Sequence, residues 1–187
     1  MSRFLIHETP LAGLKLIERK PIGDERGFLQ RLFCQESFDS LLGGKTIRQV
    51  NHTITRKAGT LRGMHFQYPP NSEIKIVSCL KGKVWDVAVD LRKGSPTFLK
   101  YHAVTLSEEV PYSYFIPEGF AHGFQALTLD CELIYFHTAD YDVASEGMLN
   151  ALDPALGIQW PVVITERSKR DEQHAMLPDT FAGVEVV

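Results

Sequence analysis

The clearest strand signal in the chain is Lys83-Val84-Trp85-Asp86-Val87-Ala88-Val89-Asp90-Leu91. Alternate residues of a strand face the same side, so the large apolar side chains of this stretch share one face. The opposite face carries Asp86 and Asp90 among small apolar residues. We therefore interpret this stretch as a β-strand, and several segments around it follow a similar pattern.

Five other segments show strand signals and are separated by turn residues. They are Ile74–Leu80, Tyr101–Leu106, Tyr112–Ile116, Gly123–Leu127 and Cys131–His137. Short strands at such close spacing predict a sandwich or a barrel. We expect a mainly β fold, an antiparallel jelly-roll barrel with a few short helices.

The helical additions are few and short. Apolar residues at helical spacing predict a helix near Glu36–Leu42, which Gly43 and Gly44 end. We expect a second helical turn at Glu146–Leu152. A loop or short helix is expected to begin at Ser168–Asp171.

Length and composition favour one domain over residues 1–187. The chain is 44% hydrophobic and 23% charged, with a net charge of -3, which disfavours a general nucleic-acid surface but allows a local basic pocket. No apolar run approaches the ~20 residues that span a bilayer, and the N-terminus lacks the apolar core of a signal peptide. Three widely spaced cysteines, Cys34, Cys79 and Cys131, favour reduced thiols and a cytoplasmic location, with Cys79 and Cys131 in the core.

Chemically versatile side chains lie on the predicted strands. If Leu61–Gln67 is extended, His65 faces one side and Arg62 the other, unless a bulge turns Arg62. A barrel interior would then receive His65, Lys75, His122 and Tyr135 together. Taken singly, a strand histidine or lysine is usually solvated or hydrogen-bonded, and a strand tyrosine is usually part of the core. The case for a site therefore rests on the whole pattern.

Two segments resemble the signatures of the cupin superfamily of jelly rolls. Pro117, Gly119 and His122 match its PxGxxH element. The other signature is incomplete, because His65-Phe66-Gln67 stands where a metal-binding cupin has His-x-His. A transition metal needs three or four nitrogen or oxygen ligands, so the familiar metal cage is disfavoured.

A closer resemblance is to the dTDP-4-dehydrorhamnose 3,5-epimerase family, metal-independent cupins that act on nucleotide-linked 4-keto-6-deoxysugars. It extends from about Asp24 to Asp171. The matching stretches are Asp24–Phe28, Gln49–Asn51, Gly59–Gln67, Asp86–Phe98, Ile116–Phe124, Tyr135 with Tyr141, Asp153-Pro154 and Trp160-Pro161.

The resemblance implies a role for each matching residue. His65 would be the base, held by Asp171, while Lys75 would stabilise the enolate and Tyr135 would return the proton from the opposite face. The implied substrate-binding residues are Arg26, Gln49, Asn51, Arg62, His122 and Tyr141. No metal and no other cofactor is implied.

The resemblance also implies a homodimer in which an N-terminal strand crosses to the neighbour. Phe4–Ile6 and Leu14–Ile17 would supply it, or would instead complete the chain's own sheet. The implied pathway is polysaccharide or glycoconjugate synthesis.

Several alternatives remain open. The expected substrate is a dTDP-linked 4-keto-6-deoxyhexose, but Arg31 stands where many family members have a glutamate, which leaves CDP- and GDP-linked substrates open as alternatives. Inversion at C3 alone, or a 3,4-ketoisomerase reaction, would suit the same fold. A metal-dependent cupin oxygenase and a non-catalytic sugar-nucleotide binding module are less favoured alternatives from other classes.

Overall fold

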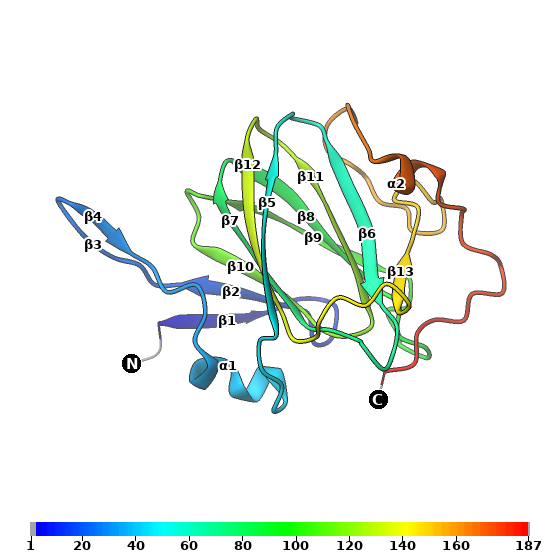
Figure 1. Ribbon diagram of the computed structural model, residues 1–187, viewed down its shortest axis with the longest axis horizontal. Coiled ribbons are helices and arrows are strands. Elements are labelled where there is room, and N and C mark those ends of the chain that lie inside the picture. The colour runs from blue at the N-terminus through cyan, green and yellow to red at the C-terminus, as the bar shows by residue number, and fades with distance from the viewer. Residues whose placement is uncertain (1–2, 187) are drawn as a thin grey trace.

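The computed structural model describes residues 3–186, in which two large antiparallel sheets form a jelly roll (Figure 1). The first sheet has the order β1-β2-β10-β7-β12-β5. Its strands are β1 (Phe4–Glu8), β2 (Lys15–Arg19), β5 (Gln49–Thr55), β7 (Lys75–Lys81), β10 (Tyr112–Ile116) and β12 (Cys131–His137). The second sheet has the order β13-β6-β11-β8-β9. Its strands are β6 (Leu61–Gln67), β8 (Lys83–Asp90), β9 (Tyr101–Ser107), β11 (Phe120–Ala126) and β13 (Glu146–Met148).

The predicted mainly β jelly roll is confirmed, and so are the predicted strands. Strands β6, β10 and β12 match the sequence-based bounds, and the ends of the other predicted strands shift by a few residues. Strand β11 begins earlier than predicted, at Phe120, because its first residues pair with β8. The predicted N-terminal strands complete this chain's own sheet, where β1 pairs with β2 and lies at the edge.

The space between the two sheets is filled by apolar side chains from both. Val77, Tyr114 and Leu133 come from the first sheet, and Ala88 and Phe124 come from the second. The predicted core cysteines, Cys79 and Cys131, are buried there and are free thiols. Tyr135 belongs to this cluster and also lines a large cavity, so the core directly supports one wall of that cavity.

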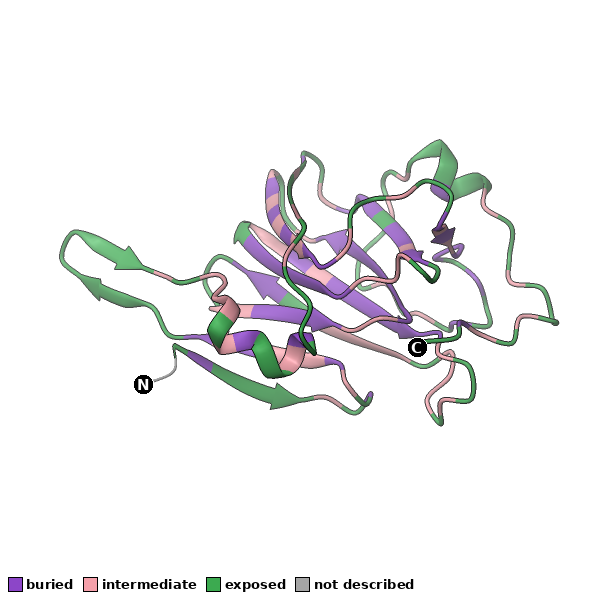
Figure 2. Ribbon diagram, turned by 60° about the horizontal axis from the view of Figure 1, so that its bottom comes forward, coloured by how far each residue is buried: buried purple, intermediate pink, exposed green. Residues whose placement is uncertain are grey.

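The outer faces of the sheets are covered in different ways. Helix α1 (Gln35–Leu42) packs Phe38 and Leu42 against the first sheet, and Gly43 ends it in the left-handed region at φ 58°. The C-terminal part of the chain packs Trp160 and Phe181 against the second sheet. The buried strands and the largely exposed covering segments are distinct in Figure 2.

A third, small sheet extends away from the barrel. It is the hairpin of β3 (Ile22–Asp24) and β4 (Gly27–Leu29), whose residues are all exposed (Figure 2). Its apolar side chains Phe28 and Leu29 are 71% and 74% exposed.

The prediction of a helical turn at Glu146–Leu152 is wrong. Residues Glu146–Met148 form β13, in which Gly147 pairs with Phe66 and Met148 pairs with His65. A Cβ atom at Gly147 would lie 2.4 Å from the Phe66 ring, so the close approach of these strands depends on glycine. Three residues are too few to show the period of a strand, and tertiary pairing decides the conformation here.

The other helical prediction, at Ser168–Asp171, is confirmed by helix α2 (Lys169–Gln173). Ser168 is its N-cap, and its hydroxyl accepts a hydrogen bond from the Asp171 backbone N–H at 3.1 Å. No helix between residues 3 and 186 has the length and apolar character needed to cross a membrane.

Candidate active site

A cavity of about 690 Å³ opens between the two sheets, walled by β5, β6, β7, β11 and β12 and by the segment that leads into α2. The predicted site residues that line it are Asn51, Arg62, His65, Lys75, His122, Tyr135 and Asp171. The predicted convergence of His65, Lys75, His122 and Tyr135 in one interior is therefore present. His65 and Asp171 are far apart in the sequence, so most of the chain must fold before the site forms.

Strand β6 places both Arg62 and His65 on the cavity because it contains a bulge. His65 pairs with His122, whereas Arg62 pairs with Phe124, so β6 has one more residue than β11 between these pairs. The extra residue turns Arg62 toward the cavity, which is the exception that the strand pattern allowed. Gly63 makes this possible, because at φ 112° a Cβ would lie 2.6 Å from the Gly123 Cα.

His65 and Asp171 are in hydrogen-bond contact in the wall of the cavity. His65 Nε2 lies 2.8 Å from Asp171 Oδ1, and the carboxylate side chain is only 3% exposed. Burial acts to raise the pKa of Asp171, but the hydrogen bond and charge of His65 and the bond to Ser168 bring it below its usual value. Because Asp171 occupies Nε2, the Nδ1 atom of His65 is the nitrogen that remains for proton transfer.

Lys75 is buried in the cavity wall and held by two acceptors. Its Nζ lies 3.1 Å from Glu73 Oε1 and donates to the His65 backbone carbonyl at 3.2 Å. An ammonium carries three N–H donors, so one remains after these two contacts. Since Lys75 also lines the cavity, that donor is suited to an oxygen of a bound molecule.

His122 and Tyr135 form a buried polar pair deeper in the cavity. His122 Nε2 lies 2.8 Å from Asp86 Oδ1, and the His122 ring lies edge-on to Tyr135 at 5.9 Å between centroids. Burial raises the pKa of Asp86, against the opposing effects of His122 and Lys75. Burial, with Asp86 nearby, also raises the pKa of Tyr135. The phenol is therefore protonated at neutral pH and is a potential proton donor.

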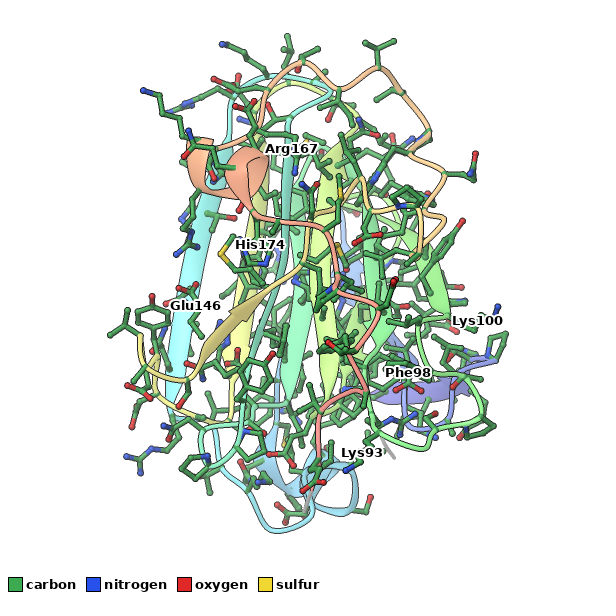
Figure 3. The ribbon with its side chains drawn as sticks, turned by 90° about the vertical axis from the view of Figure 1, so that its right-hand side faces the viewer. Lys93, Phe98, Lys100, Glu146, Arg167 and His174 are labelled. Atoms are coloured by element: carbon green, nitrogen blue, oxygen red, sulfur yellow. The ribbon has the colours of Figure 1, made fainter. Side chains whose placement is uncertain are left out.

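Cations outnumber anions on the cavity wall. Beside Lys75, the lining includes Arg56, Arg62, Arg167 and Arg170, whereas the acidic lining residues are Glu166 and Asp171. Arg167 precedes α2 at one end of the barrel, where Figure 3 labels it, and donates to the Asp171 backbone carbonyl. This local basic pocket suits an anion such as a diphosphate although the whole chain is acidic.

The remaining predicted binding residues lie at the rim or beyond it. Gln49 and Tyr141 contact each other at the rim, where the Tyr141 N–H donates to Gln49 Oε1 at 3.0 Å. The Tyr141 ring is exposed, and its hydroxyl donates to Glu146, which also accepts from Arg170 of the cavity wall. Figure 3 labels Glu146 on β13. Arg26 lies at the turn of the hairpin that projects from the barrel (Figure 1) and pairs with Asp24, and it is not among the residues that line the cavity.

Arg31 follows the same hairpin and does not line the cavity of its own chain. Gln67, at the position of the missing metal ligand, bonds to backbone groups of Asp140 and Asp142. Within residues 3–186 no group of three His, Cys, Asp or Glu side chains could hold a metal ion.

Sequence reasoning missed three polar residues that support the site. Asp86 contacts His122, and Glu73 joins Lys75 to His137, whose ring lines the cavity. Two features of the sequence pointed to these residues: Asp86 alternates with apolar residues in β8, and His137 shares a strand face with Tyr135. Neither feature identifies the hydrogen-bond partner of the residue, because the partners are distant in the sequence.

Comparison with known proteins agrees with this geometry. The family model described as dTDP-4-dehydrorhamnose 3,5-epimerase matches residues 8–179. The Salmonella typhimurium protein named dTDP-4-dehydrorhamnose 3,5-epimerase is 42% identical over 175 residues, which cover 92% of this chain and 95% of that protein.

Solved structures are also similar over nearly the whole chain. The dTDP-6-deoxy-D-glucose-3,5-epimerase of Legionella pneumophila, in complex with dTDP-4-keto-L-rhamnose, superposes with a TM-score of 0.91 at 38% identity, covering 98% of this chain and 99% of that one. A 3'-monoepimerase of Streptomyces bikiniensis, in complex with dTDP-quinovose, has a TM-score of 0.83 at 34% identity, covering 91% and 86%.

Proposed function

This chain belongs to the dTDP-4-dehydrorhamnose 3,5-epimerase family, and from that premise we propose how its cavity performs the reaction. The protein is an epimerase that inverts C3 and C5 of a dTDP-linked 4-keto sugar. What we propose is the role of each side chain, the subsite that each occupies and the assembly that completes the site.

His65 is the base that removes the proton from the carbon next to the ketone. The C4 ketone makes the C3 and C5 protons acidic, because the negative charge that remains is delocalised onto oxygen. The observation that carries this role is the 2.8 Å contact between His65 and the buried carboxylate of Asp171. That carboxylate fixes the orientation of the imidazole and occupies Nε2, which leaves Nδ1 to accept the proton.

Lys75 and Tyr135 complete the reaction. The third Lys75 N–H donates to the C4 oxygen and stabilises the enolate as its charge develops. Tyr135, whose raised pKa keeps its hydroxyl protonated, donates a proton to the carbanion from the face opposite His65. Arg62 and His122 contact the sugar or its phosphate beside them.

The nucleotide occupies the basic side of the cavity and its rim. The arginines of the wall bind the diphosphate, because guanidinium groups meet phosphate oxygens with paired hydrogen bonds. Asn51 and Gln49 contact the nucleobase or a sugar hydroxyl, and the exposed Tyr141 ring stacks on the nucleobase. The cation excess of the lining supports this assignment.

The active form is a homodimer, and this accounts for the position of Arg26. The hairpin that carries Arg26 extends away from its own barrel and exposes Phe28 and Leu29 (Figure 1). In a dimer this hairpin packs on the partner and brings Arg26 to the partner's diphosphate. A cytoplasmic location, a single domain over residues 1–187 and a role in polysaccharide synthesis stay predictions.

The test of the proposed roles is proton exchange followed by NMR in heavy water, with dTDP-, CDP- and GDP-linked 4-keto sugars. We expect deuterium at C3 and C5 of the dTDP sugar, and His65→Ala to lower that exchange by about 10²–10⁴-fold while remaining folded. Unchanged exchange in His65→Ala would overturn the assignment of the base. Deuterium at C3 alone would favour the 3-epimerase alternative, and transfer of the ketone to C3 would favour a ketoisomerase.

A further inference from the structure

Beneath the cavity, Glu73 joins Lys75 to His137. Its Oε1 lies 3.1 Å from Lys75 Nζ, and its Oε2 lies 2.7 Å from His137 Nδ1. The Glu73 and Lys75 side chains are each 9% exposed. A charge this deeply buried needs a partner, and Glu73 supplies the carboxylate in contact with the Lys75 ammonium.

Beyond His137, the hydrogen bonds continue to the rim of the cavity. Asn51 Nδ2 lies 3.4 Å from His137 Nε2, and Gln49 Nε2 donates to Asn51 Oδ1 at 3.1 Å. At the rim, Gln49 Oε1 accepts from the Tyr141 N–H at 3.0 Å. These contacts form one continuous series of hydrogen-bonded groups from the Tyr141 backbone to the Lys75 side chain. We call this series of polar contacts the Tyr141–Lys75 chain.

The direction of every bond in the Tyr141–Lys75 chain follows from its rim end. A backbone N–H can only donate, so Gln49 must present its oxygen to Tyr141 and its amide nitrogen to Asn51. Asn51 then accepts through its oxygen and donates through its nitrogen to His137 Nε2. An imidazole that accepts at Nε2 is neutral and carries its proton on Nδ1, and it donates this proton to Glu73.

We propose that Glu73 and His137 are positioning residues for Lys75, and that the Tyr141 backbone sets the His137 tautomer through Gln49 and Asn51. Glu73 thereby accepts from both neighbours and stays ionised. Burial acts to raise its pKa, but the Lys75 charge and the His137 hydrogen bond bring it below its usual value. With one N–H on Glu73 and one on the His65 carbonyl, the third is left for the cavity that Lys75 lines.

This inference rests on the proposed enolate contact of Lys75, but its first test does not. Nitrogen-15 NMR of the wild-type enzyme without substrate reports which imidazole nitrogen of His137 carries the proton. Comparison with His137→Phe assigns the signal. We expect a neutral ring protonated at Nδ1. A ring protonated at Nε2, or at both nitrogens, would overturn the proposal whatever the activity.

The second test is Glu73→Gln. To accept from Lys75, the new amide must turn its nitrogen toward His137 Nδ1, which forces the His137 proton to Nε2. Asn51 and Gln49 must then reverse, and the reversal fails at the Tyr141 N–H, which cannot become an acceptor. We expect kcat to fall by about 10–100-fold, the loss of a charged hydrogen-bond partner, with KM little changed because the enolate forms only in the transition state.

The control is Glu132→Gln on the outer face of the same sheet. Glu132 also joins a histidine and a lysine, His52 at 3.2 Å and Lys81 at 3.7 Å, but away from the cavity. We expect this variant to keep wild-type kcat and KM. An unchanged kcat in Glu73→Gln, or an equal loss in both variants, contradicts the positioning role. An inactive wild-type enzyme would instead contradict the proposed function. The His137 tautomer would still test the hydrogen-bond directions in the Tyr141–Lys75 chain.

Discussion

At the residue scale, the two proposed proton-transfer groups, His65 and Tyr135, differ in their surroundings. The His65 side chain is 31% exposed and contacts a carboxylate, whereas Tyr135 is buried and its pKa is raised. Tyr135→Phe removes the donor on one face and leaves the base on the other, so His65 must return the proton it removed. We expect inversion to fall by about 10²–10⁴-fold while deuterium still enters the unreacted sugar. NMR of recovered substrate checks this, and loss of both exchange and inversion would assign the initial base step to Tyr135 instead.

The contribution of Asp171 to the free energy of unfolding should depend on pH. Its pKa is below the usual value in the folded protein, so it stabilises the fold above the unfolded-state pKa, and this contribution disappears as the pH falls through the folded-state pKa. We expect Asp171→Asn to lower the free energy of unfolding by about 1.5–3 kcal/mol near neutral pH, the value of a charged hydrogen bond, and by progressively less below pH ~4. Urea denaturation from pH 6 to pH 3 measures the difference. A difference that is independent of pH would show that the ionised carboxylate is not the stabilising form.

At the scale of the element, the bulge in β6 decides where Arg62 and His65 point. Gly63→Ala combines a left-handed φ with a Cβ only 2.6 Å from the Gly123 backbone. Gly94→Ala is the matched control, because Gly94 has φ 76° and open space around its Cβ position. We expect a loss of about 1–2 kcal/mol from Gly94→Ala, the cost of the backbone conformation alone, and a larger loss from Gly63→Ala. Thermal unfolding and kcat together test this, since only Gly63→Ala should also displace His65. Equal losses of stability in the two variants would mean that β6 and β11 can move apart at little cost in free energy.

The elements also show what the sequence can predict and what it cannot. Alternation over β8 and β12 identifies those strands because each is long enough to show its period. The bulge was foreseen only as an exception, since it depends on Gly63 and Gly123 meeting across two strands. The resemblance to a family named the residues around the cavity, but the partners Asp86 and Glu73 emerge only from the packing of distant segments. Glu146–Met148 was missed because pairing with β6, and not local pattern, makes it a strand.

At the scale of the whole molecule, one chain brings together the proposed base, its carboxylate and the proton donor, but not Arg26. Arg26 lies on a hairpin directed away from the barrel (Figure 1), and Phe28 and Leu29 of the same hairpin are exposed. A dimer in which each hairpin serves the neighbouring cavity accounts for both observations. In the dimer that we propose, the two halves of a site can be inactivated on different chains.

That division of the site makes a specific prediction for mixed dimers. His65→Ala and Arg26→Ala homodimers should each lose activity, the first by about 10²–10⁴-fold for loss of a base, and the second by about 10–100-fold for loss of a charged hydrogen bond to phosphate. When the two variants are unfolded together and refolded, half of the random dimers are mixed. Each mixed dimer has one cavity with both substitutions and one with neither, so activity should recover to about a quarter of the wild-type value. If Arg26 served its own chain, every cavity in the mixture would carry a substitution, and refolding together would restore nothing.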